Sequence, residues 1–462
     1  MTIIGIMALQ LKYQYIIAGA GPTGISALET LLKRGVPPTT ILIVDINPEI
    51  WHQRNMSEDR NKFSLRSVVE RERGLHGLGK VGSIVLDKAR LDSPLFYWGL
   101  SCYMPSNLLL KRWKVDLEAF NECFENSLSF LEVQGRDGQH LDTHNNTQRK
   151  KLALTIIQRN PKFENSWLAL SSSGANKCTL DGGCFENCIA RAPITPDRLL
   201  EKVTQKWGVP AHFIGEIKDI DLENRSIDVH GVKIHYEKLL LCLGANNSRR
   251  LLAKSTSAEI ALKGTPVGLI PFWSFNASKR GDFSSHFSYS DLILPLYKAG
   301  EIDSFSQLYL PSMEIAGRIL ATMPRFIQSF FKNLGERSTW KIFGHIGICM
   351  VFLKESDMTE TKSEVKKTLD TMYPELRMSL RRARIYSFKP FMRFLLNGSS
   401  RHLGGISAKD DLSYGYHSNF WKKLSSQNVF VLDTGLLPSI QPGPHTLIAI
   451  ALSKYLISEM KI

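Results

Sequence analysis

The sequence predicts an α/β protein with two domains. One is built on a mainly parallel sheet and is discontinuous in the chain; the other is an α+β domain on a mostly antiparallel sheet. A glycine-rich turn lies between two strand-like runs within residues 15–45, and the apolar runs 239–243 and 428–432 have the same buried-strand character. Residues 264–400 show the longer strand-like runs of an antiparallel sheet. We therefore assign residues 1–100, 176–263 and 401–462 to the first domain, and residues 101–175 and 264–400 to a second, substrate-binding domain.

The first element is a strand at residues 15–18 that runs into a glycine-rich turn, Gly19-Ala-Gly-Pro-Thr-Gly24. In a G-x-G-x-x-G turn the first glycine permits the bend, the second lets backbone approach a pyrophosphate, and the third lets helix and strand pack closely. A helix follows, with its apolar residues on one stripe and its positive N-terminal end at the turn. The candidate phosphate-binding residues are Gly19, Gly21, Pro22, Thr23 and Gly24.

The second strand, at residues 41–44, ends at Asp45. This acid lies at about the twenty-residue distance from the glycines at which a carboxylate holds a ribose hydroxyl. A lone glycine motif is a weak signal. Strand, turn, helix, strand and acid in this order predict a Rossmann-like dinucleotide site.

The composition is that of an ordinary globular protein, with 43% of the 462 residues hydrophobic and 22% charged. The net charge of +14 favours acidic partners, but the basic residues are scattered along the sequence and no nucleic-acid-binding motif occurs, so no nucleic acid partner is expected. No run reaches the roughly eighteen apolar residues of a membrane span, and the first strand begins too early for a signal peptide. Seven cysteines, an odd number, favour free thiols in the cytoplasm.

The segments that follow Asp45 are mixed in character. Glycines at positions 77, 79 and 82 suggest a second backbone strip against a flat ligand. Residues 115–130 and 196–207 have helical periodicity, whereas residues 152–157 and 166–170 alternate like two strands around a turn. Cys178, Cys184 and Cys188 lack both a C-x-x-C pair and a fourth soft ligand, so no metal site is expected.

The second domain contains strand-like runs at 285–296, 304–310, 341–353 and 382–396. Between them, the segment from Ser312 to Lys332 has the pattern of a basic amphipathic helix. Such a helix packs on its own domain or lies on a membrane surface, so a peripheral membrane contact through this segment stays open.

The C-terminal stretch again shows the pattern of the first domain, with short apolar strands and glycine-containing turns. His402 is followed by a glycine pair, and the strand at 428–432 ends in Asp433. A proline-rich loop then leads through His445 and Thr446 into a closing helix at 446–457. The turn after the strand at 239–243 likewise begins with a glycine, Gly244.

With these motifs in order, the chain resembles the glucose-methanol-choline family of FAD-dependent oxidoreductases, in a compact form similar to members from bacterial sugar and polysaccharide pathways. The likeness spans nearly the whole chain and rests on Gly19 to Gly24 with Asp45, Gly79 to Ser83, Cys178 to Cys188, Cys242 to Leu252, and His402 to Gly405 with Asp433 to Thr446. It implies FAD as the cofactor. It also adds cofactor-binding residues: Gly82, Ser83, Gly244, Asp433, Thr434 and Thr446.

The resemblance also implies catalytic roles. In this family a histidine of an H-x-x-G motif lies beside the flavin and accepts the substrate hydroxyl proton as hydride leaves, and His402 matches it. The family places a second His or Asn just before the closing helix. His445 is the matching choice, although the spacing to the neighbouring proline differs.

We therefore expect oxidation of the CH–OH group of an alcohol or sugar substrate by hydride transfer to flavin N5, with oxygen, a quinone or a protein as the electron acceptor. A nicotinamide-dependent reductase would explain the first motif but not the second nucleotide-facing segment at Asp433. A catalytically degenerate FAD-binding or scaffold protein of a membrane-associated polysaccharide pathway stays open as the alternative from another class.

Overall fold

A computed structural model describes residues 11–45, 101–136, 147–171, 178, 194, 196–274, 290–311, 345–357, 362–387, 393–395, 402–411 and 413–460. Several residues singled out from the sequence lie outside these ranges: the glycines at positions 77, 79 and 82 with Ser83, Cys184, Cys188, and the segment from Ser312 to Lys332. The described chain is a mixed α/β structure with several sheets, as predicted.

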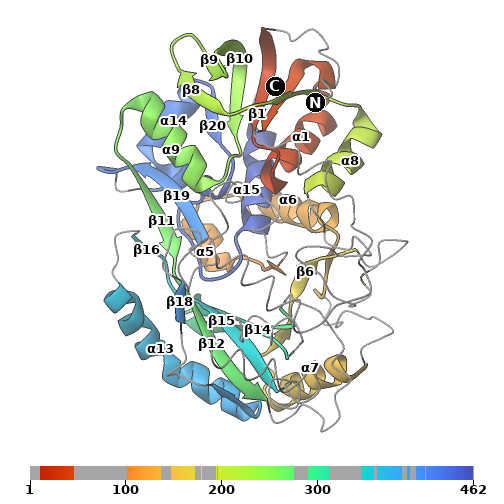
Figure 1. The fold of residues 1–462 in the computed structure, drawn as a ribbon, viewed down its shortest axis with the longest axis vertical. Coiled ribbons are helices and arrows are strands. Elements are labelled where there is room, and N and C mark those ends of the chain that lie inside the picture. The colour runs from red at the N-terminus through yellow and green to blue at the C-terminus, as the bar shows by residue number, and fades with distance from the viewer. Residues whose placement is uncertain are drawn as a thin grey trace, which may run out of the picture.

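The first sheet is parallel at its centre (Figure 1). β1 (Lys12–Ala18) pairs in parallel with β2 (Ile41–Asp45) on one side and with β10 (Val232–Leu241) on the other. β7 (Ala211–Ile214) adds to β2, and β20 (Val429–Val431) adds to β10, both in parallel. β9 (Ser226–Val229) and β8 (Ile217–Asp221) continue the sheet as antiparallel strands beside the start of β10.

Helices cover both faces of this sheet, which explains why its central strands are almost continuously apolar. One face, with Tyr15, Ile17 and Ile43, packs against α1 (Pro22–Lys33), α6 (Leu117–Phe130), α8 (Pro196–Trp207) and α15 (Thr446–Glu459). The other face, with Ile16 and Val44, packs against α9 (Ala245–Thr256) and α14 (Asn419–Ser426). The predicted helices at 115–130, 196–207 and 446–457 are confirmed, and α6 lies against α15 although its segment was assigned from sequence to the second domain.

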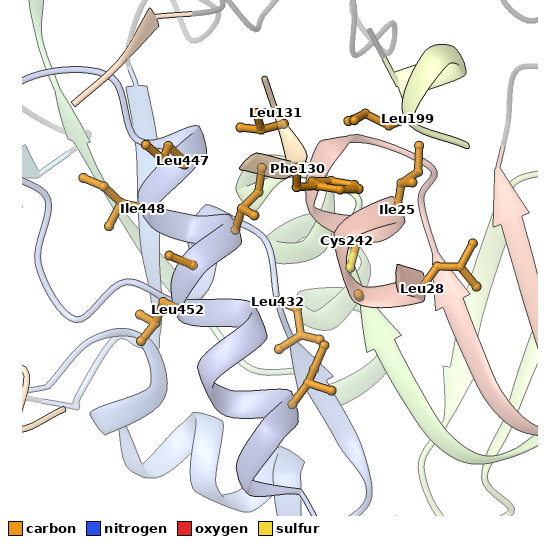
Figure 2. Close-up of a cluster of buried hydrophobic side chains, with 14 of the residues drawn as sticks. Ile25, Leu28, Phe130, Leu131, Leu199, Cys242, Leu432, Leu447, Ile448 and Leu452 are labelled. Carbon is orange, nitrogen blue, oxygen red and sulfur yellow. The ribbon is translucent and has the colours of Figure 1, made fainter. Parts of the chain in front are cut away.

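Helix α15 lies at the centre of the larger core. Leu447, Ile448 and Leu452 are fully buried and share a cluster with Phe130 of α6 and Ile25 of α1 (Figure 2). A helix that is apolar on all sides can form only where other elements surround it, because an exposed apolar face would cost solvation free energy.

A buried ion pair joins α15 to α1. Lys454 Nζ donates to Glu29 Oε2 at 2.8 Å, and both side chains are less than a tenth exposed. The ammonium also lies 4.6 Å from the centre of the Phe130 ring. Glu29 Oε1 also pairs with Lys33 at 2.8 Å, so removing Glu29 would leave the buried Lys454 ammonium uncompensated, whereas removing Lys454 would leave Glu29 one partner.

The second sheet is antiparallel in every pairing that the described residues make. Its order is β17 (Ile385–Ser387), β12 (Val267–Ser274), β15 (Ile346–Phe352), β14 (Glu301–Tyr309), β13 (Leu292–Lys298) and β5 (Glu164–Asn165), with β18 (Arg393–Leu395) beside β12. Its outer face packs against α13 (Lys362–Arg382) and α7 (Thr147–Arg159). A mostly antiparallel sheet covered on one side is what the sequence predicted.

Two local predictions were wrong. Residues 152–157, predicted as a strand, lie inside α7 because Leu152, Ala153 and Ile156 pack as one helical face on the second sheet. The predicted strand at 382–396 is instead the end of α13 followed by the short strands β17 and β18. A short apolar run fits either element, and the surface it packs on decides between them.

Smaller elements connect the two sheets. β19 (His402–Ala408) pairs with β11 (Ile260–Thr265), which pairs with β16 (Ser356–Asp357), and β11 runs on into β12. β3 (Ser101–Cys102), β6 (Trp167–Ala169) and β4 (Val133–Gln134) form another small sheet, and α5 (Asn107–Arg112) follows β3. Among the helices that the structure describes, none combines the length and apolar content of a membrane span.

Candidate cofactor-binding and active site

The carboxyl ends of four neighbouring parallel strands lie level. Ala18 is in register with Val44 and with Leu241, and Leu241 is in register with Val431. The next residues along the chain are therefore brought to one edge of the sheet: Asp45, the Gly19 turn, Gly244 and Asp433. β2 lies on one side of β1, and β10 followed by β20 lies on the other, which is the strand order at which open α/β sheets bind ligands outside the carboxyl ends of their strands.

The glycine turn after β1 is as tight as the motif predicts. Gly19 has φ +100°, and a Cβ there would lie 2.5 Å from the carbonyl oxygen of Cys242. A Cβ on Gly24 would lie 2.0 Å from the carbonyl oxygen of Gly19, so the start of α1 approaches β1 more closely than any side chain allows. Gly21 is the N-cap residue, Pro22 occupies the first turn, and Thr23 is buried.

Asp45 lies at the end of β2 and faces the same turn. Its Oδ2 accepts a hydrogen bond from the backbone N–H of Ala20 at 2.6 Å. The bond holds the carboxylate between the two strands, within the turn that the sequence predicts to bind phosphate. A carboxylate retains further lone pairs when one oxygen accepts an N–H, so Asp45 can also accept a ligand hydroxyl.

Three helices begin at this edge without a side-chain cap. The N-cap residues of α1, α9 and α15 are Gly21, Gly244 and His445, and none of them caps its helix with a side-chain hydrogen bond. In contrast, side chains of Ser106, Asp116 and Ser418 cap α5, α6 and α14. Uncapped N–H groups and the positive end of the helix dipole favour an anionic or electron-rich ligand.

Asp433 is buried and held on three sides. Ser248 donates its hydroxyl to Oδ2, Gly435 donates its N–H to Oδ1 at 2.7 Å, and the N–H of Gly244 also bonds the carboxyl. Burial raises the pKa of Asp433 to about 6, and these three donors limit the rise. The carboxyl links the turn after β10 to the turn after β20, so it fixes the mutual position of two site segments.

Ser248 was not identified from the sequence. Its only signal is a serine one turn into the helix after Gly244, in a segment rich in polar residues. Thr434 begins the short helix η6 (Thr434–Leu436), directly after Asp433.

His445 is 3% exposed and lies in the loop that enters α15, next to Thr446, the first helical residue. Its Nε2 lies 2.6 Å from the carbonyl oxygen of Gln441. A carbonyl only accepts, so Nε2 carries the proton and any proton acceptance by His445 falls to Nδ1. The sequence could not show this, because the bond depends on the fold of the proline-rich loop.

The side chain of Gln441 was also missed by the sequence analysis. It is 7% exposed, and neither its oxygen nor its nitrogen has a hydrogen-bond partner among the described residues. A buried amide without partners costs about 1–3 kcal/mol. The Gln441 amide, in the loop before α15, can therefore donate and accept hydrogen bonds to a molecule bound beside it.

His402 begins β19 opposite Thr265 of β11. The strand passes beside η6, where a Cβ on Gly404 would lie 2.7 Å from the carbonyl oxygen of Thr434. The structure therefore brings the backbone at His402 to the segment that follows Asp433. The side chain of His402 lies outside the described residues.

The loop between η6 and α15 is attached to the second domain. Glu355 accepts a hydrogen bond from the N–H of Ile440 at 2.6 Å, and it forms an ion pair with Lys263 at 3.1 Å. A Cβ on Gly443 would lie 3.2 Å from the Phe305 ring, which belongs to the inner face of the second sheet. The uncapped start of α15 therefore faces the second sheet across a short loop (Figure 1).

The cysteines that the structure describes are free thiols. Cys242 lies beneath the glycine turn, and burial raises the pKa of its thiol well above the ordinary value. Cys178 is buried in the core that contains α1 and α15. Both therefore pack as small apolar side chains.

Neither the protein-family models nor the curated proteins with which the sequence was compared match it. Solved structures do match. A variant of Aspergillus oryzae RIB40 formate oxidase, from work on FAD modification, aligns with 97% of this chain and 97% of its own, at a TM-score of 0.53 and 8% identity. A second variant from that work gives 0.51 and 9%, and a further formate oxidase crystal structure gives 0.52 and 9%, each with 97% of both chains covered. At this identity the likeness shows that the chain shares their fold.

Proposed function

We propose that this protein is an FAD-dependent oxidoreductase that oxidises the CH–OH group of an alcohol or sugar substrate. The proposal rests chiefly on the three uncapped helix N-termini that surround one edge of the parallel sheet. The fold shared along 97% of the chain with formate oxidase, a member of the glucose-methanol-choline family, supports it. The sequence motifs are in the order of that family, from Gly19 to Thr446.

In this proposal the first domain is a Rossmann-like FAD-binding domain. The free N–H groups at the start of α1 bind the pyrophosphate, and the glycines at 19, 21 and 24 let backbone reach it. Asp45 accepts a ribose hydroxyl. Gly244, Asp433 and Thr434 hold the middle of the cofactor, and the start of α15 with Thr446 meets the flavin ring, where the helix dipole favours negative charge.

FAD, when bound, supplies a hydride acceptor at flavin N5. His402 accepts the proton of the substrate hydroxyl, which makes the carbon a better hydride donor. His445 orients the hydroxyl through Nδ1, because Nε2 is committed to the Gln441 carbonyl. The inner face of the second domain, which carries Phe305, lines the substrate site. Side chains on this face determine whether the site accepts an alcohol or a sugar.

The first experiment is a visible absorption spectrum of the purified protein, before and after denaturation. We expect a two-banded flavin spectrum and release of FAD on unfolding. Anaerobic mixing with candidate alcohols and sugars should then bleach the flavin, and admission of oxygen or a quinone identifies the acceptor. A protein that is colourless and does not take up added FAD would refute the proposal.

Exchange of His402 for Ala tests the assigned base. The variant should retain FAD but lose roughly 100-fold or more in the rate of bleaching, in the range that general base catalysis contributes. His235→Ala is the matched control, because His235 is exposed at the opposite end of β10. Equal loss in both variants would contradict the assignment.

A second candidate is a catalytically degenerate FAD-binding scaffold, for example in a membrane-associated polysaccharide pathway. It is favoured by one observation: the ring of His445 is turned to its own loop by the bond to Gln441. A protein that binds FAD tightly, yet shows no bleaching with any alcohol or sugar and no change on His402→Ala, would establish this candidate.

A further inference from the structure

Helix α13 carries a basic surface on the side that faces away from the second sheet. Its inner side, with Leu369, Leu376 and Leu380, is fully buried against the sheet. The outer side, continued by the turn that follows, presents exposed cations: Lys366, Lys367, Arg377, Arg381, Arg382 and Arg384. Charges that are dispersed in the sequence are thus gathered on one side of a helix.

These cations have no ion pair among the described residues. The acids on the same helix, Glu364, Asp370 and Glu375, are fewer than the cations, and Glu375 lies 3.9 Å from another cation, Lys162. The surface therefore keeps a positive potential that attracts an anionic partner.

Helix α7 extends this surface on one side. The side-chain amide of Asn160, just after α7, donates to the carbonyl of Ser379 in α13 at 3.0 Å, so the two helices are neighbours. Both cover the same outer face of the sheet (Figure 1). α7 adds Lys151, which is exposed, and Leu154, which is 37% exposed. We refer to the outward sides of α7 and α13, through Arg384, as the α7–α13 face.

Large apolar side chains project from the same face. Met378 is 57% exposed and lies between Arg377 and Arg381 in the last turns of α13, and Leu154 projects from α7. Apolar groups beside long cationic side chains are the pattern of surfaces that lie at a lipid headgroup boundary. A nucleic acid would engage the cations but would leave Met378 and Leu154 without a role.

We propose that the α7–α13 face docks on an anionic lipid bilayer, with the arginines and lysines at headgroup phosphates and with Met378 and Leu154 at the acyl boundary. The candidate site lies on the other side of the second sheet, where Phe305 meets the loop before α15, so docking leaves it open. The proposal does not depend on the cofactor, the reaction or the segment from Ser312 to Lys332.

The test is co-sedimentation of the full-length protein with phosphatidylcholine vesicles that contain about 30% phosphatidylserine, at low ionic strength. Each cation near an anionic surface strengthens binding about fivefold, so the triple variant Arg377→Gln, Arg381→Gln, Arg382→Gln should bind on the order of 100-fold more weakly. Raising the salt from about 0.1 M to about 0.5 M should also weaken binding by the wild type. Met378→Ser should weaken binding while leaving its salt dependence unchanged.

The matched control removes the same charge elsewhere. Lys218, Arg225 and Lys233 are exposed on the strands beside the start of β10, and their exchange for Gln should leave vesicle binding within about twofold of wild type. Unchanged thermal midpoints exclude misfolding. The proposal is overturned if wild type does not sediment with anionic vesicles, if both triple variants lose binding equally, or if heparin or DNA is bound while vesicles are not.

Discussion

The buried carboxyl of Asp433 gives a sharp test of the site as the structure describes it. Its pKa of about 6 in the folded protein compares with 3.8 for an ordinary aspartate. A group whose pKa is raised on folding stabilises the fold only while it is protonated. Its contribution is therefore present below about pH 3.8 and is lost as the pH rises through about 6. Above that range the protein without ligand contains an ionised carboxylate in a buried position.

Exchange of Asp433 for Asn removes this cost while keeping an oxygen for the Gly435 N–H and a donor for Ser248. At about 1.4 kcal/mol for each unit of pKa difference, the variant should be more stable than wild type by about 3 kcal/mol at pH 8 and about 1 kcal/mol at pH 4.5. The gain in stability should grow between about pH 3.8 and about pH 6 and level off at higher pH.

The assay is denaturant unfolding of the cofactor-free protein across this pH range, followed by tryptophan fluorescence, with the difference in unfolding free energy taken at each pH. Asp116→Asn is the control, because Asn caps α6 as well as Asp does and the site is exposed. A difference that stays flat with pH, or a variant that is less stable at pH 8, would refute the argument that burial dominates at Asp433.

Three further predictions concern the same core. Gly24→Ala should lower the affinity for FAD at least tenfold and destabilise the fold by about 1–3 kcal/mol, because the added Cβ would overlap the Gly19 carbonyl. Titration calorimetry measures the affinity and thermal melting measures the stability. Normal FAD binding by the variant would contradict the prediction. Glu29→Met should destabilise by about 3–5 kcal/mol by stranding the buried Lys454 ammonium, whereas the double exchange of Glu29 and Lys454 for Met should recover most of that loss in urea unfolding; a double variant no better than the single one argues against the pair. Gln441→Leu should raise the stability of the cofactor-free protein by about 1–3 kcal/mol, because it removes a buried amide without partners, and it should weaken ligand binding. A fall in stability would show that the amide has a partner.

The element types of the first domain were largely predictable because they follow from local chemistry. The short apolar runs at β1, β2 and the end of β10 predict buried strands, and the glycines after β1 predict a tight turn. The motif also predicted the steric closeness that the structure shows at Gly24. The clearest failure, at residues 152–157, is a short amphipathic run for which packing on the second sheet selected the helix.

By itself, the sequence determined the tight glycine turn and the carboxylates at the ends of two strands, because covalent spacing along a strand, turn and helix is enough to place them. Only the tertiary structure decided that Asp45, Gly244 and Asp433 lie level at one edge of the sheet, since their register depends on pairing between distant strands. It also decided that Ser248 and the N–H of Gly244 hold Asp433 and that Gln441 orients His445. The tertiary structure also decided that the cations of α13 lie together on one exposed side. Hydrogen bonds, burial and surface charge all depend on contacts between residues that are far apart in the sequence.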